Sequence, residues 1–200
     1  MKGDITMGDL PMYFLLTYLS FASTWFEPQE IKHLEDDVDQ VFCLAENVYH
    51  EARGEPDIGK SAVAHVVLTR ARRSDFPNSI CKVTKQGPVY ESWKTRQTPN
   101  PDDAIYWPVK HKCQFSWYCD GKSDNIQLKY KSKQAWIQSN LKGWKESVKA
   151  AVHAYSGLSN DPTNGATHYF AHKKIDPPHW ANKFKVTRIV GGHTFLKKPF

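Results

Sequence analysis

Apolar side chains recur every three or four residues between about residues 35 and 53. They are Val38, Phe42, Ala45, Val48 and Ala52. This period is typical of a helix with one buried face. Gly54 and Pro56 interrupt the pattern, so we expect the helix to end there. The segment "YHEARGE", residues 49–55, therefore spans the end of a predicted helix.

Two further stretches have the same period, one from about Asp57 to Arg73 and one over about 131–155. In the first, the inward positions are expected to be Ile58, Ala62, Val66 and Leu68, with Val63 and Val67 beside them. In the second, the apolar side is expected to consist of Trp136, Ile137, Leu141, Trp144, Val148, Ala151, Val152 and Tyr155. Gly143 is expected to bend or divide this second helix.

The other segments are shorter or less regular. "DFPNSI" predicts a turn, "CKVTKQ" a short helix and "SGLSNDPTNGA" a loop. Residues 88–112 are polar, contain proline and predict an irregular inserted loop. "CQFSWYCDG" predicts a strand or hairpin ending at Asp120-Gly121, and the last forty residues predict short strands and turns. Together these elements predict an α+β fold that is predominantly α.

Residues 10–26, "LPMYFLLTYLSFASTWF", carry no charge and lie at the lower edge of the length that spans a bilayer as a helix. A signal peptide or membrane anchor is one interpretation, and a buried or interfacial helix is the other. We therefore treat residues 1–34 as an apolar leader or anchor with an acidic linker. Residues 35–200 then form the main domain, which suits a chain of 200 residues.

The net charge of +6 favours polyanionic partners, among them nucleic acid, an anionic membrane and an acidic cell wall. Because the lysines are dispersed and no arginine-rich block or RNA-binding aromatic pattern occurs, we expect no nucleic-acid partner. The four cysteines permit two disulfides. Cys113 and Cys119 could bridge a short loop, which leaves Cys43 and Cys81 to join two helices. Free thiols stay open as the alternative, since a cytosolic protein would keep them reduced.

Glu51 closes the first helix, and the residues that precede it on the same face are apolar. Desolvation raises the pKa of a carboxyl held at the mouth of an apolar groove. Such a group can stay protonated near neutral pH and donate a proton to a leaving oxygen. The alternative is a solvated glutamate paired with Arg53 or Arg70.

Histidines and cysteines offer rival chemistry. Catalytic zinc needs three ligands and an open position. The candidate ligands are His168, His172, His179 and His193, but their spacing matches no helical HExxH motif. A cysteine nucleophile with a histidine base has no local sequence support. We therefore predict neither a metal nor a cofactor.

Polar and aromatic residues alternate in "QFSW", residues 114–117. On a strand, Gln114 and Ser116 would share a face that can hydrogen-bond a sugar, with Phe115 and Trp117 on the other face. Tyr169 in "HYFAH" and Trp180 in "PPHWA" are further candidates for stacking on a ligand. Each of these aromatics alone is more often a packing residue.

Five segments, taken in order, resemble the SleB/CwlJ-type cell wall hydrolases. They are "LAENVYHEARGEPDIGKSAVAHVVLTRAR", "FPNSIC", "QFSWYCDG", "DPTNGATHYFAH" and "GGHTF". The resemblance runs from about residue 40 to 197 and skips the loop at 88–112. It implies a lysozyme-like, mostly helical fold related to resuscitation-promoting factors and lytic transglycosylases. It also implies cleavage of the β-1,4 bond between N-acetylmuramic acid and N-acetylglucosamine.

The resemblance implies roles for individual residues. Glu51 matches the family's catalytic acid, and Glu55 matches the second glutamate, which is expected to support the turn and the groove. The positions expected to shape the cleft are Gln114, Ser116, Trp117, His168, Tyr169 and His193. A lytic transglycosylase needs only one carboxyl, acting as acid and then as base, and gives a 1,6-anhydro product. A water-adding muramidase needs a second carboxylate, for which Asp120, Asp161 and Glu55 are candidates.

The expected partner is the glycan strand of peptidoglycan, met in the cell envelope, the periplasm or outside the cell. Residues 10–26 leave membrane association open. A phage lysis enzyme, a component of a phage particle and a bacterial remodelling enzyme are alternative settings, and the short chain favours phage lysis. The rival functions are a zinc amidase that uses the C-terminal histidines and a glycan-binding or structural module without catalysis.

Overall fold

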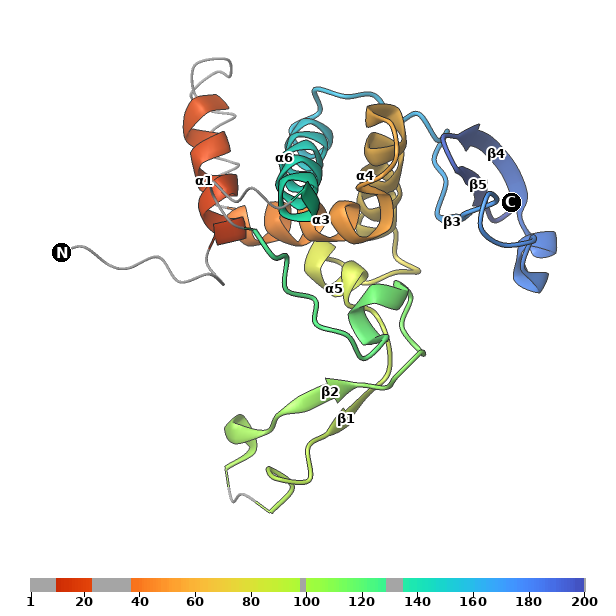
Figure 1. Cartoon of the computed structure of the whole chain (residues 1–200). Coiled ribbons are helices and arrows are strands. Elements are labelled where there is room, and N and C mark those ends of the chain that lie inside the picture. Colours follow the sequence, from red (N-terminus) through yellow and green to blue (C-terminus); the bar gives the residue numbers. More distant parts are fainter. Residues whose placement is uncertain (1–9, 23–36, 98–99, 129–134, 200) are drawn as a thin grey trace.

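A computed structural model describes residues 10–22, 37–97, 100–128 and 135–199 (Figure 1). Within these ranges, helices form the body of the molecule, and two small antiparallel sheets lie at its periphery. The predicted fold class, α+β and predominantly α, is confirmed.

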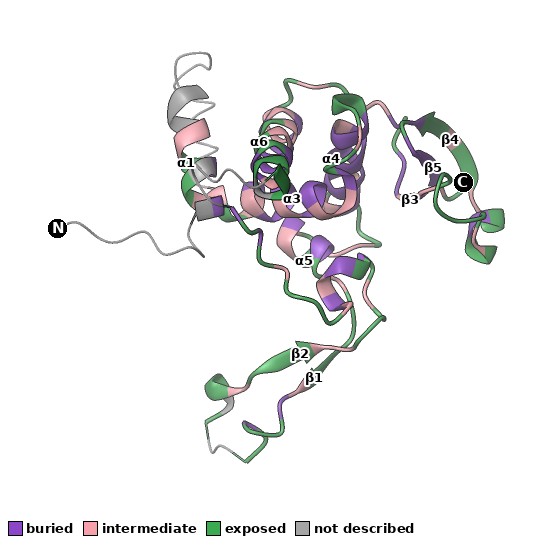
Figure 2. Cartoon of the chain, in the orientation of Figure 1, coloured by how far each residue is buried: buried purple, intermediate pink, exposed green. Residues whose placement is uncertain are grey.

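Three helices build the core: α3 (Val38–Ala52), α4 (Asp57–Ala71) and α6 (Ala135–Tyr155). They pack against one another in pairs, and their buried faces coincide at the centre of the molecule (Figure 2). The indole of Trp144 on α6 is fully buried there and meets the rings of Phe42 and Tyr49 edge-on. The hydrophobic period therefore predicted all three helices and most of their inward faces.

Two details of the helix predictions were wrong. Ile58 and Trp136 were assigned to buried faces but are 56% and 52% exposed, because each lies in the first turn of its helix beyond the reach of the core. Gly143 does not divide α6, which runs through it without a break. A Cβ atom at this position would lie 3.3 Å from Cβ of Arg53, so the glycine permits the close approach of α3 and α6.

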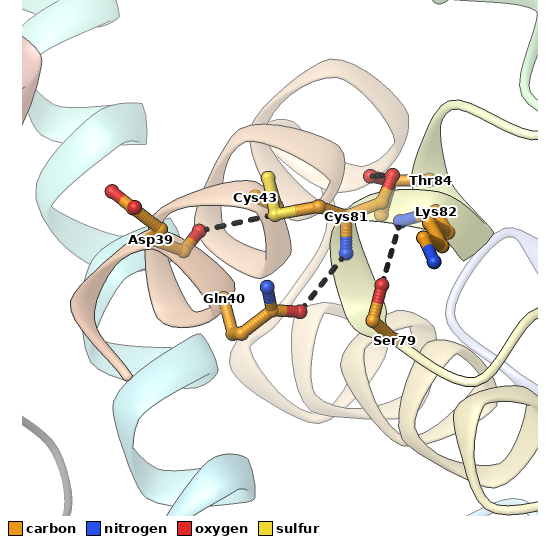
Figure 3. The surroundings of a disulfide bond; sticks show 7 residues. All are labelled: Asp39, Gln40, Cys43, Ser79, Cys81, Lys82 and Thr84. Atoms are coloured by element: carbon orange, nitrogen blue, oxygen red, sulfur yellow. Dashed lines mark hydrogen bonds between the residues drawn. A yellow bond between two sulfur atoms is a disulfide. The ribbon is translucent and has the colours of Figure 1, made fainter. Parts of the chain in front are cut away.

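The short helix α5 (Ile80–Thr84) is attached to α3 by a disulfide between Cys43 and Cys81 (Figure 3). The hydroxyl of Ser79 accepts a hydrogen bond from the Lys82 amide and so caps the helix. The side chain of Gln40 on α3 accepts a second hydrogen bond, from the Cys81 amide at 3.2 Å. Covalent and polar contacts thus fix α5 against the end of α3 that is remote from Glu51.

Residues 88–112 were predicted as an irregular loop, and this was wrong. Strands β1 (Val89–Glu91) and β2 (Tyr106–Pro108) pair antiparallel, with Tyr90 opposite Trp107. A short 3₁₀ turn, η1 (Pro101–Asp103), lies in the connection between them. The hairpin projects away from the helical body and is largely exposed (Figures 1 and 2). The strand residues are few and lack a buried face, so hydrophobic alternation could not reveal them.

The segment "CQFSWYCDG" does not form the predicted strand. Residues Ser116–Cys119 form a 3₁₀ turn, η2, inside a loop closed by the disulfide between Cys113 and Cys119. The predicted alternation is nevertheless present, since Gln114 and Ser116 are exposed while Phe115 and Trp117 are buried. A loop of this size cannot extend as a strand between two bonded cysteines.

The C-terminal part forms a three-stranded antiparallel sheet in the order β3-β5-β4. The short strands predicted for the last forty residues are therefore confirmed. The strands are β3 (His168–Phe170), β4 (Lys185–Val190) and β5 (His193–Lys197), and η3 (His179–Lys183) lies between β3 and β4. The predicted loop after α6 is present as a series of turns. In one of them, the Asp161 carboxylate accepts hydrogen bonds from Thr163 and from the Gly165 amide.

Helix α1 (Leu10–Ala22) packs against α6. Leu15 is fully buried, and the Trp144 indole donates a hydrogen bond to the Pro11 carbonyl at 3.2 Å. None of the helices in the described ranges has the length and apolarity needed to cross a bilayer. The predicted linker between the apolar run and residue 35, and with it the boundary between leader and main domain, lies outside the described residues.

Candidate active site

Glu51 occupies the last turn of α3, where the helix ends against a cleft. The cleft has a volume of about 490 Å³. Its walls come from the ends of α3 and α6, from η2 and the loop that follows it, from the segment after β3 and from the start of β5. Predicted site residues in its wall are Glu51, Ser116, Trp117 and His193. The buried hydrophobic face of α3 thus fixes the helix in the core, and the Glu51 side chain in its last turn lies at the cleft.

Tyr169 on β3 holds the carboxyl of Glu51. Its hydroxyl donates a hydrogen bond to Glu51 Oε2 over 3.0 Å. The tyrosine ring in turn meets His193 edge-on, with ring centroids 5.3 Å apart, and packs near Phe195. Burial raises the pKa of the Tyr169 hydroxyl well above its ordinary value, and the neighbouring Glu51 charge adds to this effect. The hydroxyl therefore stays neutral and acts as a donor.

The environment of Glu51 favours its protonated form. Burial raises the pKa of the carboxyl above its ordinary value. The hydrogen bond from Tyr169 and the positive charges of Lys174 and Arg70 act in the opposite direction without cancelling the effect of burial. A carboxyl with this balance retains its proton to higher pH than a solvated glutamate does, and it can release that proton to a basic atom in the cleft.

Glu51 forms no salt bridge with Arg53 or Arg70, which was the alternative considered from the sequence. Arg70 on α4 donates a hydrogen bond from Nε to the Thr167 carbonyl at 2.6 Å, and its guanidinium lies over the rings of Phe76 and Phe115. Burial lowers the pKa of Arg70 to about 10, so it stays charged at neutral pH. The Arg53 guanidinium lies over the Tyr49 ring instead. Both arginines act on the site through their charge, without a salt bridge to Glu51.

A stacked pair forms one wall of the cleft. The rings of His50 and Trp117 are nearly parallel, with centroids 4.7 Å apart, and the Trp117 indole donates a hydrogen bond to Asn47 Oδ1 at 3.0 Å. His50 Nε2 lies 3.2 Å from the Asp124 carbonyl oxygen. Burial lowers the pKa of His50 to about 4, so its imidazole is neutral at neutral pH. These contacts fix η2 and its following loop to α3.

Two more carboxyl groups, those of Asp120 and Asp124, line the same cleft. Burial raises the pKa of Asp124, and the charge of Asp120 adds to this shift. Asp161, the other loop aspartate considered from the sequence, is committed to the turn at Thr163 and Gly165 and does not line the cleft. The candidates for a second catalytic carboxylate are therefore Asp120 and Asp124.

Glu55 has a different position from Glu51. Its Oε2 accepts a hydrogen bond from the Gly192 amide at 2.7 Å, in the turn between β4 and β5. A Cβ atom at residue 192 would lie 2.8 Å from Glu55 Oε1, so a larger residue there would force the carboxylate to move. Glu55 does not line the cleft. It ties the end of "EARGE" to the sheet and thereby sets the position of His193 beside it.

The remaining predicted residues line a second pocket, of about 580 Å³. They are Gln114, His168 and Trp180. Tyr169 also lines this second pocket while its hydroxyl bonds Glu51 in the first. Except for Glu55, the predicted binding residues thus line one or other of two pockets, and Tyr169 connects the pockets because it lines one and bonds a carboxyl of the other.

The histidines do not converge. His168 lines the second pocket, His193 lines the Glu51 cleft, and His172 Nδ1 lies 3.2 Å from the Thr194 hydroxyl. Throughout the part of the chain that the structure describes, no three His, Cys, Asp or Glu side chains are grouped so that they could hold a metal ion.

Several residues of the site were not found from the sequence. His50, Asp124 and Lys174 line the cleft but belong to no motif that would have marked them. Arg70 was considered only as an ion-pair partner. Its helical period placed it on the buried face of α4, and a buried arginine is unusual enough to have marked it as a candidate.

Comparison with known proteins assigns the chain to a family. The model of the family described as Cell Wall Hydrolase matches residues 54–196. Two solved structures are similar to the chain, each at 25% identity over 79% of it. One is the catalytic domain of the Bacillus cereus SleB protein, with 89% of that chain covered and a TM-score of 0.46. The other is the catalytic domain of the germination-specific lytic transglycosylase SleB from Bacillus anthracis, with 93% covered and a TM-score of 0.49. No curated protein matches the chain.

Proposed function

The chain belongs to the cell wall hydrolase family and is a peptidoglycan-degrading enzyme, and from this premise we propose which bond it cleaves and how. The bond is the β-1,4 linkage between N-acetylmuramic acid and N-acetylglucosamine, and Glu51 is the acid and base. The observation that carries the proposal is the position of Glu51, a partly buried carboxyl with a raised pKa in an open cleft. The lysozyme-like relation implied by the resemblance belongs to the same proposal.

In the first step, the protonated Glu51 carboxyl donates its proton to the glycosidic oxygen while the bond from that oxygen to C1 of muramic acid breaks. In the second step, the Glu51 carboxylate accepts the proton of the C6 hydroxyl on the same sugar, and the C6 oxygen bonds to C1. The product is a 1,6-anhydromuramic end, and no water is consumed. The Tyr169 hydroxyl keeps the carboxyl oriented during both steps.

A water-adding muramidase is the second candidate, and one observation favours it. Asp120 and Asp124 line the Glu51 cleft, so a carboxylate is available to act on a water molecule or on C1 from across the cleft. The single-carboxylate mechanism is preferred because it needs only Glu51, whose carboxyl is already oriented in the cleft by a hydrogen bond from Tyr169.

The other rivals have less support. A zinc amidase would need histidines that converge, and His168 and His193 line separate pockets. A glycan-binding module without catalysis would not need a carboxyl with a raised pKa in the cleft. We also propose action outside the cytoplasm, because the two disulfides suit an oxidising environment. Phage lysis, predicted above, is one setting that meets this condition.

The test is mass spectrometry of purified peptidoglycan digested by wild type and by Glu51→Gln, each with and without EDTA. We expect 1,6-anhydro ends from wild type in both conditions and none from Glu51→Gln. Reducible muramic ends would replace the transglycosylase by a hydrolase and direct attention to Asp120 and Asp124. Free stem peptides that disappear in EDTA would refute the role of Glu51.

A further inference from the structure

The second pocket differs from the Glu51 cleft in charge. No aspartate or glutamate lines it, whereas Arg70 and Lys112 both do. Burial and the nearby charge of Arg70 lower the pKa of His168 to about 4, so this histidine contributes no charge near neutral pH. The pocket is therefore a cationic site, open on one side, in an enzyme whose catalytic cleft contains three carboxyl groups.

Two polar atoms of the pocket residues are buried without a hydrogen-bond partner among the described residues. One is a donor, Nη1 of Arg70, whose residue is only 2% exposed. The other is an acceptor, Oε1 of Gln86. Buried polar groups in native proteins are almost always paired, so an unpaired donor and an unpaired acceptor at one pocket indicate a ligand that supplies both partners.

The rest of the lining describes the same ligand more closely. Trp180 and Phe184 form an aromatic side, with ring centroids 5.8 Å apart, and Phe184 packs on His168 at 4.3 Å. Lys112 also lines the pocket, is exposed and forms no ion pair in the described residues. Three groups on a ligand would match this lining: an amide N–H for Gln86 Oε1, an anionic oxygen for Arg70 and Lys112, and a short aliphatic part for the aromatic side.

We propose that this pocket is a subsite for the peptide stem of peptidoglycan, with a stem carboxylate held by Lys112 and Arg70 and a stem amide N–H donated to Gln86. The inference rests on the proposed function, because the stem is attached to the muramic acid whose bond Glu51 cleaves. Tyr169 supplies the connection, since it lines this pocket and its hydroxyl bonds Glu51. The two pockets thus receive different parts of one substrate.

Kinetics on three forms of the same glycan strands tests the proposal. The first form carries intact stems, the second has its stem carboxylates coupled to methylamine, and the third has its stems removed. For wild type we expect KM to rise about tenfold on the amidated strands, as loss of a charge-assisted hydrogen bond would cause, with kcat little changed. We expect a similar rise on the stem-free strands, although these expose the lactyl carboxylate of muramic acid.

Lys112→Gln is the first variant, since an exposed side chain can change without harm to the fold. It should raise KM several-fold on intact strands and respond little to amidation. Lys82→Gln, which removes the same charge from an exposed site on α5, is the matched control and should behave as wild type. Gln86→Ala is the second variant and should raise KM on intact and amidated strands alike.

An unchanged wild-type KM on amidated strands would overturn the proposal. So would a low KM on stem-free strands that depends on Lys112, because the recognised carboxylate would then be the lactyl group. Binding of a soluble stem peptide to the Glu51→Gln protein tests the peptide site independently of glycan cleavage. If that binding depends on Lys112 while wild type cleaves no glycan, the proposed function fails and the peptide site stands.

Discussion

Two pockets lie on either side of Tyr169, and they differ in their charged groups. The Glu51 cleft is lined by carboxyl and cationic side chains together, namely Glu51, Asp120, Asp124, Arg53, Lys122 and Lys174. The other pocket is lined by Arg70 and Lys112 with no acidic residue. Both are open, and they have similar volumes, about 490 and 580 Å³. Size alone would therefore not distinguish the catalytic site. The difference in titratable groups does, because only the first contains a carboxyl whose pKa is raised by burial.

The contrast extends to how each pocket is held. The Glu51 cleft has internal contacts that orient its groups, namely the Tyr169 hydroxyl on Glu51 and the stacking of His50 on Trp117. The cationic pocket has two unpaired buried atoms, Arg70 Nη1 and Gln86 Oε1, and the Glu51 cleft has one, His193 Nδ1. The difference therefore lies in the charged groups themselves. The Glu51 carboxyl is oriented before the substrate arrives, as proton transfer requires, whereas Arg70 can complete its hydrogen bonds with a ligand.

The largest expected effect separates the chemical roles of the two pockets. Glu51→Gln should lower kcat by about 10³-fold, within the usual range for loss of a general acid and base, with KM little changed. Steady-state digestion of purified glycan strands measures both constants. The matched control is Glu46→Gln, on the same helix but outside the cleft, which should retain activity. Equal losses in both variants would remove the special status of Glu51.

The disulfides provide the next test, since one of them lies between the pockets. The loop of Cys113–Cys119 brings Gln114 to the cationic pocket and Ser116 to the cleft. Replacing both cysteines by alanine should lower the free energy of unfolding by about 2 kcal/mol and also raise KM several-fold. Denaturant titration and steady-state kinetics provide the two values.

Replacing Cys43 and Cys81 by alanine is the counterpart, because that bridge lines neither pocket. Its closed loop is longer, with a sequence separation of 38 against 6, so about 4 kcal/mol should be lost. The activity of the folded fraction should be unchanged. A larger change in KM here than in the Cys113–Cys119 variant would contradict the assigned positions.

Tyr169→Phe tests the link between the pockets. Removing the hydroxyl should lower kcat about tenfold, because the carboxyl loses the hydrogen bond that orients it. The same hydrogen bond lowers the pKa of Glu51, so its loss should raise that pKa further. A general acid is active while protonated, and the high-pH limb of the rate profile should therefore move to higher pH. A shift to lower pH would show that Tyr169 acts in another way.

The smallest expected effect concerns stability and also depends on pH. Since burial raises the pKa of Glu51 in the folded protein, the unfolded chain ionises first, and ionisation of Glu51 destabilises the native state. Glu51→Gln should therefore be more stable than wild type above the folded pKa, and the difference should disappear below the unfolded pKa. Thermal unfolding across this pH range measures the difference. Greater stability of wild type at high pH would contradict a raised pKa.

The sequence predicted the helices and the position of Glu51 at a helix end for the same physical reason. The apolar faces of α3, α4 and α6 are strong periodic signals, and Glu51 follows one of them directly. Elements with little burial escaped the analysis, as the exposed hairpin of β1 and β2 shows. The segment at Gln114 was assigned the correct buried and exposed sides but the wrong backbone, because a 3₁₀ turn and a strand can produce the same short alternation.

The division into two pockets could not be predicted from the sequence. Gln114 and Ser116 are two positions apart, yet they line different pockets, because the buried Phe115 lies between them and packs toward Tyr169. Glu55 and Gly192 are brought together by the β4–β5 turn, a contact across 137 positions that no local pattern encodes. Such separations are set by tertiary packing rather than by local preference.

The most direct test of the account is a side-by-side measurement of kcat and KM for Glu51→Gln and Lys112→Gln on intact peptidoglycan strands. If the two pockets have separate roles, Glu51→Gln should lose kcat and retain KM, and Lys112→Gln should retain kcat and raise KM. Loss of kcat in Lys112→Gln, or retention of kcat in Glu51→Gln, would show that the Glu51 cleft and the cationic pocket do not have separate roles.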